Sequence, residues 1–405
     1  MSAAPWDSAV ARAIELRRAL HAEPELTWAE HDTAARVRAA LDGLGIAWCA
    51  CADTGTVATL APAAGGRHIA LRADLDALPI HEQTGLPWRS RREGCMHACG
   101  HDGHTATLYA AAAWLAAVED RLPGPVTLLF QPAEEGGHGA ERMISDGALD
   151  GVDAVFGWHN WPAIPFGRAV CPDGVVMAGN GTYRLTLRGA GGHASQPELC
   201  RDPVLAAAAV VQALQQIVSR RLPAQAATVL SITSIDARSN PTVIPDDAVI
   251  EGSFRIADAA DRERLGELMT EIATGTAAGY GVACEVELFP RYGPTVNHAE
   301  EAACYRGALA AEFGPAVLDG GTRLPIMASE DFSYYLRERP GAFALVGAGD
   351  DQACHQVPCH SARYDFNDAL IAPMARVYAR LAGAPLPDAP VAHPLPDEAT
   401  TEERQ

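Results

Sequence analysis

The sequence contains no run of about 18 or more apolar residues, the length that a membrane-spanning helix requires. It also begins without the basic segment and apolar stretch of a secretory signal, so we expect a cytoplasmic location and no membrane partner. Basic residues are scarce, because 31 arginines, with no lysine in the sequence, face 51 aspartates and glutamates, for a formal net charge of −20. Phosphate binding needs a basic face, so this balance argues against a nucleic-acid partner.

The sequence also lacks the signs of a disulfide framework and of a short zinc-protease motif. Its ten cysteines are scattered along a chain without a secretory signal, which favours reduced thiols. We expect most of them to be buried core residues and only some to bind metal. The motif His-Glu-x-x-His, which marks zinc hydrolases of a different fold, does not occur.

What the sequence does contain is typical of a globular protein, with 48% apolar and 20% charged residues. Its 405 residues exceed the usual size of one hydrophobic core, so we expect two domains. Apolar strands alternate with helices up to residue 180 and again from residue 295, which predicts an α/β sheet covered by helices. The expected elements are two helices within 7–42, strands at 68–74, 125–131, 152–158 and 342–346, and helices at 105–118, 140–146 and 299–312.

Residues 181–294 follow a different pattern. Strands are expected at 182–188, 228–235, 249–256 and 284–289, and helices at 202–221 and 259–279. This β-α-β-β-α-β order is the signature of a ferredoxin-like unit. We therefore predict one domain in two parts, 1–180 and 295–385, with a ferredoxin-like domain inserted at 181–294. The segment 386–405 is rich in proline and acidic residues and is predicted to be disordered.

Histidine, cysteine and carboxylate side chains are concentrated in four segments, 96–104, 131–138, 157–160 and 358–368. Three of these lie where a predicted strand ends or a predicted helix begins, and the carboxyl ends of strands form the ligand crevice of open α/β sheets. Four such segments can together supply two divalent metal ions, which hydrolyse an amide by polarising its carbonyl and sharing a water. Because Glu134 and Glu135 are adjacent in a loop, one can bind metal while the other acts as a base on that water.

Each of these residues alone has a plainer interpretation. A histidine after a strand, such as His159, is more often a hydrogen-bonded core residue, and Cys99 alone is more often a small buried side chain. Paired glutamates usually mark a solvated turn. The coincidence of four segments at strand ends favours a metal site over these alternatives, although Cys359 is interpreted as structural.

Seven segments, in order, resemble the amidohydrolase branch of the M20 metallopeptidase clan, the relatives of hippurate hydrolases, auxin-conjugate hydrolases and N-acyl amino acid deacetylases. The resemblance runs from about Arg17 to Leu381 and rests on segments 18–25, 70–79, 97–104, 131–135, 191–193, 329–332 and 364–368. It implies an α/β, mixed-sheet metallohydrolase domain, with the inserted ferredoxin-like domain acting as a lid and dimerisation domain.

The resemblance also implies a role for individual residues. The branch's metal ligands fall on Cys99, His101, Glu135, His159 and His360, which implies two divalent ions per chain, Mn, Zn, Co or Ni. Glu134 falls on the general base, and Asp74 falls on an aspartate thought to orient a ligand. His193, in the inserted domain, falls on a histidine that reaches the partner's active site and steadies the oxyanion, which implies a homodimer. Arg255 falls on a lid arginine near the substrate.

The chain departs from the family at several positions. Thr242 stands where the family usually has an asparagine, and Asn240 lies just upstream; with Arg255 it is a candidate to bind the substrate carboxylate. Arg72 stands where the peptidase members have a histidine ligand, and His138 stands where glycine is common.

Together these residues predict a metal-dependent enzyme that hydrolyses the amide bond of small N-acyl amino acids, with an N-acetyl or N-aroyl group. The alternative is a dipeptidase or carboxypeptidase of the same clan, which Arg72 disfavours. A metal-free binding protein that kept the fold is a more distant alternative, disfavoured by the intact ligand positions and Glu134. A thiolate ligand makes magnesium an unsuitable metal.

Overall fold

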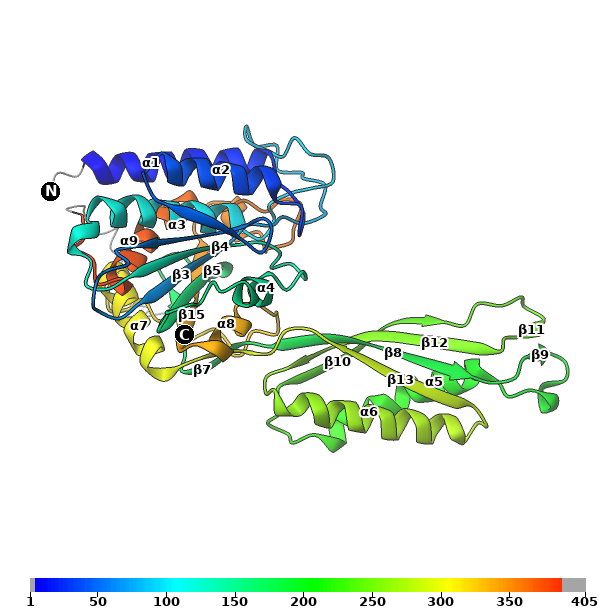
Figure 1. Ribbon diagram of the computed structural model, residues 1–405. Coiled ribbons are helices and arrows are strands. Elements are labelled where there is room, and N and C mark those ends of the chain that lie inside the picture. The colour runs from blue at the N-terminus through cyan, green and yellow to red at the C-terminus, as the bar shows by residue number, and fades with distance from the viewer. Residues whose placement is uncertain (1–3, 388–405) are drawn as a thin grey trace, which may run out of the picture. The chain divides into compact units, whose positions relative to one another are not determined.

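In the computed structural model, which describes residues 4–387, the chain forms two compact units (Figure 1). Unit 2 consists of Met177–Thr295 and Leu324–Glu330, and the remaining residues belong to unit 1. The inserted domain was predicted at 181–294, so the structure adds 324–330 to it. This segment joins unit 2 because the main-chain nitrogen of Ala178 donates hydrogen bonds to the carbonyls of Ile326 and Ala328. Most of the predicted disordered segment, 386–405, lies outside the described residues.

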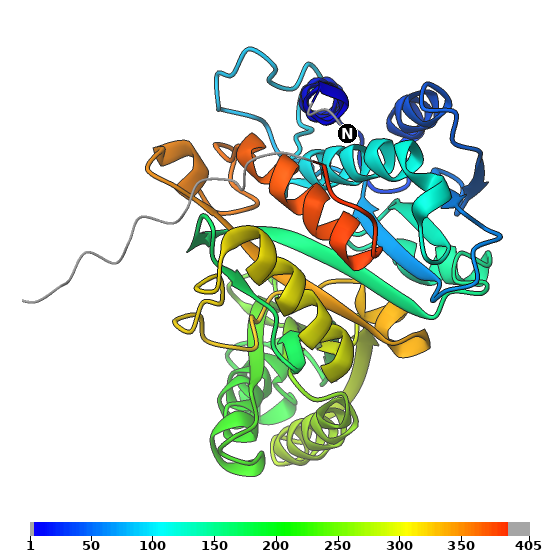
Figure 2. The same cartoon turned by 90° about the vertical axis from the view of Figure 1, so that its left-hand side faces the viewer.

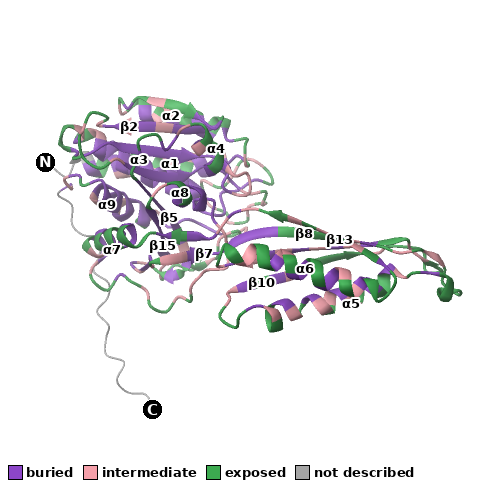
Figure 3. Ribbon diagram, turned by 60° about the horizontal axis from the view of Figure 1, so that its bottom comes forward, coloured by how far each residue is buried: buried purple, intermediate pink, exposed green. Residues whose placement is uncertain are grey.

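The centre of unit 1 is a seven-stranded mixed sheet in the order β1-β2-β4-β3-β5-β15-β6. The four central strands are parallel, whereas β1, β2 and β6 are antiparallel to their neighbours. Nearly every residue of β3, β4 and β15 is buried, as expected for parallel strands covered on both faces (Figure 3). The strands are β1 (Trp48–Cys51), β2 (Gly55–Leu60), β3 (Ile69–Asp74), β4 (Val126–Gln131), β5 (Ala154–Pro165), β6 (Ala169–Val170) and β15 (Gly341–Gly349).

Helices cover this sheet. The helix α3 packs against β3 and lies between α1 and α9, and α7 packs against α9 and β15 (Figure 2). The shorter helices α4 and α8 pack against each other, next to β4 and β15 respectively. The helices of unit 1 are α1 (Ala4–Ala22), α2 (His31–Asp42), α3 (His101–Ala117), α4 (Gly139–Ser145), α7 (Ala299–Phe313), α8 (Ser333–Glu338) and α9 (Ile371–Leu381).

Two elements of unit 1 differ from the sequence prediction in a way that matters for the site. The helix expected at 105–118 begins at His101, directly after Gly100, whose φ of 98° is a left-handed conformation that glycine adopts without steric cost. The strand expected at 152–158 continues to Pro165, because its pairing with β15 extends beyond His159. His101 therefore lies in a helix and His159 in a strand, not in loops.

Unit 2 is built on a four-stranded antiparallel sheet in the order β10-β12-β8-β13, with the helices α5 and α6 packed on it. Its core includes Leu185 and Ile250 from the sheet and Leu268 from α6. Asp202 caps α5, which ends at Leu214 and is followed by a π-helical turn where the sequence predicted one helix over 202–221. The elements are β8 (Gly179–Arg188), α5 (Pro203–Leu214), β10 (Thr228–Asp236), β12 (Asp247–Ile256), α6 (Ala260–Ala278) and β13 (Ala283–Pro290).

Short strands complete the chain. Within unit 2, β9 (Gly192–His193) pairs with β11 (Val243–Ile244). The chain passes from unit 1 to unit 2 in β7 (Gly174–Met177) and returns in β14 (Thr295–Asn297). Among the described residues, none of the helices combines the length and apolar character that spanning a bilayer requires.

Candidate metal centre

The five residues predicted to bind metal meet in unit 1. Glu135 follows β4, His159 lies within β5, and His360 lies in the loop after β15. His101 is the first residue of α3, and Cys99 lies just before this helix. The Sγ atom of Cys99 lies 3.2 Å from His159 Nε2 and 3.3 Å from His360 Nε2. His360 Nε2 also lies 3.3 Å from Glu135 Oε1. The His360 side chain is 54% exposed, so the cluster opens to solvent on its side.

These side chains form two overlapping groups that share Cys99. One group contains Cys99, His101 and His159, and the other contains Cys99, Glu135 and His360. Within each group the candidate ligand atoms all lie within 4.8 Å of one another. A thiolate shared between imidazole and carboxylate donors suits a pair of borderline divalent ions such as zinc.

The two buried histidines are oriented by their second ring nitrogen. His101 Nδ1 lies 2.8 Å from the main-chain oxygen of Asp76, and His159 Nδ1 lies 2.6 Å from that of Asn160. A histidine that donates from Nδ1 to a carbonyl leaves its Nε2 lone pair for a cation, which is the usual arrangement at metal sites. Among the described residues, His101 Nε2 and Glu135 Oε1 are buried atoms without a hydrogen bond. These atoms and the chemistry of the donor set both fit bound divalent metal.

The surroundings shift the pKa values of three candidate ligands, and burial together with His104 lowers the pKa of His159. Burial lowers the pKa of His101, but Asp74 and Asp76 outweigh burial and raise it to about 10. The Cys359 thiol, burial and the nearby glutamates raise the pKa of Cys99. A cation must displace these protons, so its affinity is expected to rise with pH.

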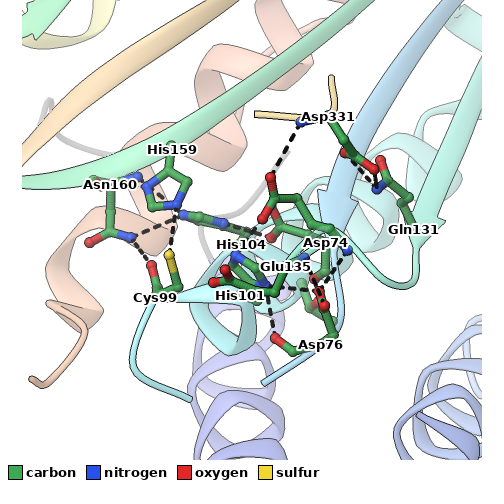
Figure 4. A network of polar contacts seen from close by, with 12 residues as sticks. Asp74, Asp76, Cys99, His101, His104, Gln131, Glu135, His159, Asn160 and Asp331 are labelled. Carbon is green, nitrogen blue, oxygen red and sulfur yellow. Dashed lines mark hydrogen bonds and ion pairs between the residues drawn. The ribbon is translucent and has the colours of Figure 1, made fainter. Parts of the chain in front are cut away.

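Asp74, which was predicted to orient a ligand, is fully buried beside the cluster (Figure 4). Its Oδ1 atom lies 2.7 Å from His104 Nδ1, and its Oδ2 atom lies 3.7 Å from His101 Nε2. Burial alone would raise the pKa of Asp74, but His101, Arg72 and His104 hold it well below its usual value. Asp74 is therefore an anion at neutral pH, and it faces the ring nitrogen of a candidate ligand.

Two further residues hold the cluster in place, and the sequence analysis assigned neither of them a role. The carboxylate of Asp76 accepts hydrogen bonds from the main-chain nitrogens of Glu134 and Glu135, at 3.0 and 2.9 Å. Asn160 Nδ2 donates to the main-chain oxygen of Cys99 at 2.8 Å. Asp76 lies in one of the segments that carried the family resemblance, so the motif contained a signal for it. No such signal pointed to the pairing of Asn160 with a residue 61 positions away.

Glu134, the predicted general base, lies next to the two ligand groups that share Cys99. It is 6% exposed, and its Oε1 atom accepts a hydrogen bond from the main-chain nitrogen of Asp331 at 3.3 Å. It forms a further group of candidate ligand atoms with His101 and Glu135. A buried carboxylate in this position is suited to accept and deliver a proton.

The three remaining predicted site residues lie in unit 2. His193 is exposed in β9, and its Nδ1 atom accepts a hydrogen bond from the main-chain nitrogen of Ser195 at 3.1 Å. Arg255, in β12, donates from Nη1 to Ser329 Oγ at 3.0 Å. Asn240 Oδ1 accepts hydrogen bonds from the main-chain nitrogen and the hydroxyl of Thr242. Thr242, the residue that stands in place of the family's usual asparagine, therefore already binds this oxygen. The roles of these residues stay predictions.

A second group of possible ligands, Cys354, His355 and Asp365, lies outside the candidate centre. Protein partners already neutralise its charges. Asp365 Oδ1 accepts a hydrogen bond from Arg17 Nη2, and His355 Nδ1 lies 2.9 Å from Asp350 Oδ2. This group is therefore better explained as a hydrogen-bonded packing cluster than as a third metal site.

The chain is similar to proteins of known family along most of its length. The sequence profile described as Peptidase family M20/M25/M40 matches residues 70–384. The N-acetyl-L-cysteine deacetylase of Bacillus subtilis (strain 168) is 40% identical over 84% of this chain and 82% of that protein. The hippurate hydrolase of Campylobacter jejuni is 37% identical over 91% of this chain and 95% of that protein.

A solved structure shares the fold. It is that of the Bacillus subtilis YXEP protein, described as a dinuclear metal binding peptidase from the M20 family. The TM-score is 0.81 at 32% identity, and the alignment covers 93% of this chain and 98% of that chain.

Proposed function

The chain belongs to Peptidase family M20/M25/M40, and on that premise we propose that it hydrolyses the amide bond of N-acyl amino acids with the help of two divalent metal ions. The observation that carries the proposal is the pair of ligand groups that share Cys99 and lie beside Glu134. The deacetylase and hippurate hydrolase relatives support an N-acetyl or N-aroyl amino acid as substrate. The buried Arg72 supports the amidohydrolase over the peptidase alternative, because a permanently charged guanidinium cannot replace a histidine ligand.

One metal ion would be held by Cys99, His101 and His159. The other would be held by Cys99, Glu135 and His360. When bound, two such ions polarise a carbonyl and make a water molecule acidic enough to attack at neutral pH. Zinc, manganese, cobalt and nickel all suit a donor set of thiolate, imidazole and carboxylate, and the native metal is one of these.

The chain's own residues move the protons. Glu134 accepts a proton from the attacking water as the new carbon–oxygen bond forms. It then delivers the proton to the nitrogen as the carbon–nitrogen bond breaks, which releases a carboxylic acid and a free amino acid. Asp76 keeps the main chain of Glu134 and Glu135 in place, and Asp74 steadies His101.

The inserted domain supplies the remaining groups. We assign unit 2 as a ferredoxin-like lid because its elements follow the order β8-α5-β10-β12-α6-β13. His193 is proposed to reach the site of a partner chain in a homodimer and to stabilise the developing oxyanion. Arg255 is proposed to bind the substrate α-carboxylate through two parallel hydrogen bonds, with Asn240 nearby in sequence as a second contact.

The test is a comparison of kcat/KM for matched substrates after loading with zinc, manganese, cobalt or nickel. N-acetyl and N-benzoyl amino acids should be cleaved, and the carboxamide of the same compound should be cleaved poorly because it lacks the carboxylate. Dipeptides with a free amino terminus serve as the control. Faster cleavage of dipeptides would replace the proposal by the peptidase alternative, and equal rates for acid and carboxamide would remove only the role of Arg255.

A further inference from the structure

The loop that carries Glu134 and Glu135 is fastened to a distant segment, 331–334, at several points. Gln131 Nε2 donates to both carboxylate oxygens of Asp331, at 2.8 and 2.9 Å (Figure 4). The main-chain nitrogen of Ala140 donates to Asp331 Oδ2 at 3.0 Å. In the opposite direction, the main-chain nitrogen of Asp331 donates to Glu134 Oε1 at 3.3 Å. Asp331 therefore binds both ends of the loop and the predicted base between them.

A buried arginine fixes Asp331 from the other side. Arg72 Nη2 donates to Asp331 Oδ1 at 3.0 Å, and Arg72 Nη1 donates to Asp74 Oδ2 at 2.6 Å. Its Nε atom donates to Gln131 Oε1 at 2.8 Å. All four side chains are at most 1% exposed. A buried guanidinium between two carboxylates is stable only while both partners stay charged and correctly placed.

We propose that Asp331 is a positioning residue for Glu134, and that Arg72 and Gln131 fix its place. This inference rests on the proposed function, in which Glu134 transfers the proton. Asp331 acts through its main-chain N–H, which holds one oxygen of the Glu134 carboxylate and so sets the direction of the other.

The contacts also predict what a change at Asp331 leaves intact. The main-chain nitrogens of Glu134 and Glu135 are held separately by Asp76, and Glu135 faces His360. We therefore expect the ligand groups to keep their shape when Asp331 is altered, whereas the hydrogen bond from Asp331 to the Glu134 side chain is disturbed. A defect in turnover without loss of metal distinguishes this role from a merely structural one.

Asp331→Asn is the sharpest single change. Both oxygens of the Asp331 carboxylate accept hydrogen bonds from N–H donors. An asparagine in its place has the same shape, but its NH₂ group must face one of these N–H donors and cannot accept from it. The segment has to shift, and Arg72 loses the Asp331 carboxylate as an ion-pair partner. We expect kcat for an N-acyl amino acid to fall by about 10- to 100-fold, which is less than the rate loss expected when a general base is removed altogether. KM and the content of two metal ions should stay near wild type.

The matched control is Glu312→Gln. Glu312 Oε1 accepts a hydrogen bond from Arg376 Nε at 2.7 Å, in another buried ion pair of unit 1 formed between α7 and α9. This variant loses a buried carboxylate of similar exposure, and its Tm should fall, yet its kcat should stay near wild type. An equal fall of kcat in both variants would overturn the positioning role of Asp331.

A double-mutant cycle tests the route through Glu134. Once Glu134→Gln has removed the base, adding Asp331→Asn should cost little further rate, because two residues that act as one unit are not additive. Full additivity, or a normal kcat in Asp331→Asn, overturns the inference alone. Full activity of Glu134→Gln overturns the proposed function instead.

If Asp331→Asn does not fold, Gln131→Met is the variant that tests the inference. Its kcat should fall several-fold at constant metal content. An unchanged kcat in Gln131→Met would overturn the positioning role of Asp331.

Discussion

Glu134 and Glu135 are neighbours in the chain, yet their side chains have different surroundings. Glu135 Oε1 lies 3.3 Å from His360 within a group that includes Cys99, whereas Glu134 Oε1 accepts the N–H of Asp331. Adjacent residues in a loop can diverge in this way because Asp76 holds both main-chain nitrogens. The geometry thus supports one ligand and one base.

The first prediction separates these two roles. Glu134→Gln should lower turnover by about 100- to 10,000-fold, the range of general-base contributions, and leave metal content near two ions per chain. Glu135→Ala should lose metal. Elemental analysis and kcat measured on the same preparations give both quantities. Loss of metal only in the Glu134 variant would exchange the two assignments.

The second prediction concerns two cysteines that lie close together. Cys99 Sγ contacts His159 and His360, whereas Cys359 Sγ lies 3.8 Å from the main-chain oxygen of Cys99. Cys99→Ala should therefore lose metal and activity, and Cys359→Ala should keep both. Thiolate-to-metal absorption of the cobalt-loaded variants measures this directly. The same loss in both variants would mean that the thiolate ligand is wrongly assigned.

At the scale of elements, the strongly patterned segments were predictable and the functional ones less so. The family inferred from the motifs is confirmed, and the apolar strands β4 and β15 lie close to their expected positions. The strand β5 was predicted too short because the polar pair His159-Asn160 interrupts its apolar run, although pairing with β15 carries it on. The strands β1 and β2, over Trp48–Cys51 and Gly55–Leu60, were not predicted, since few of their residues are large and apolar.

The candidate site shows the same division. The candidate ligand residues and Glu134 were singled out because each lies in a short segment with its own histidine, cysteine or glutamate pattern, and the structure brings them close together. Asp331 also lies in one of the quoted segments, but its partner Gln131 is 200 positions away. A contact of that kind depends on how β3, β4 and the segment before α8 meet in space, and no local pattern encodes it.

The third prediction belongs to the contact between α1 and α3. His21 Nδ1 lies 2.8 Å from Asp102 Oδ2, and both side chains are fully buried. Burial lowers the pKa of His21, but Asp102 and Glu82 outweigh burial and raise it above its ordinary value. This pair therefore stabilises the folded chain fully below the unfolded pKa of about 6.5, and the contribution disappears as pH rises through the raised pKa.

His21→Gln should consequently lower Tm by about 4 °C near pH 6, corresponding to about 1–2 kcal/mol, and by less at alkaline pH. The measurement is thermal unfolding of both proteins across this pH range, with metal content checked in each. Arg18→Gln is a suitable control, because its ion pair with Asp368 is partly exposed and should contribute little at either pH. A Tm difference that does not vary with pH would contradict the charged state of His21.

At the scale of the whole molecule, the residues of the proposed site are divided between the two units of the chain. Unit 1 contains all the candidate ligands and Glu134, and unit 2 contains His193, Arg255 and Asn240. The proposed function takes groups from both units and from a partner chain. In a symmetric dimer, the same surface of unit 2 in each chain could serve the other chain's site, as proposed above.

The last prediction tests this sharing. His193→Ala and Glu134→Ala chains should each be inactive alone, but a hybrid dimer contains one site with an intact Glu134 and an intact His193 from the partner. Random pairing of equal amounts gives about half hybrids, each with one complete site of two, so activity should recover to about a quarter of wild type. A mixture of Glu134→Ala with Glu134→Gln is the control, because no pairing of these chains restores the base. Subunit exchange is verified by mixing a tagged with an untagged chain and recovering both through the tag. If exchange occurs and activity does not return, His193 acts within its own chain or not at all.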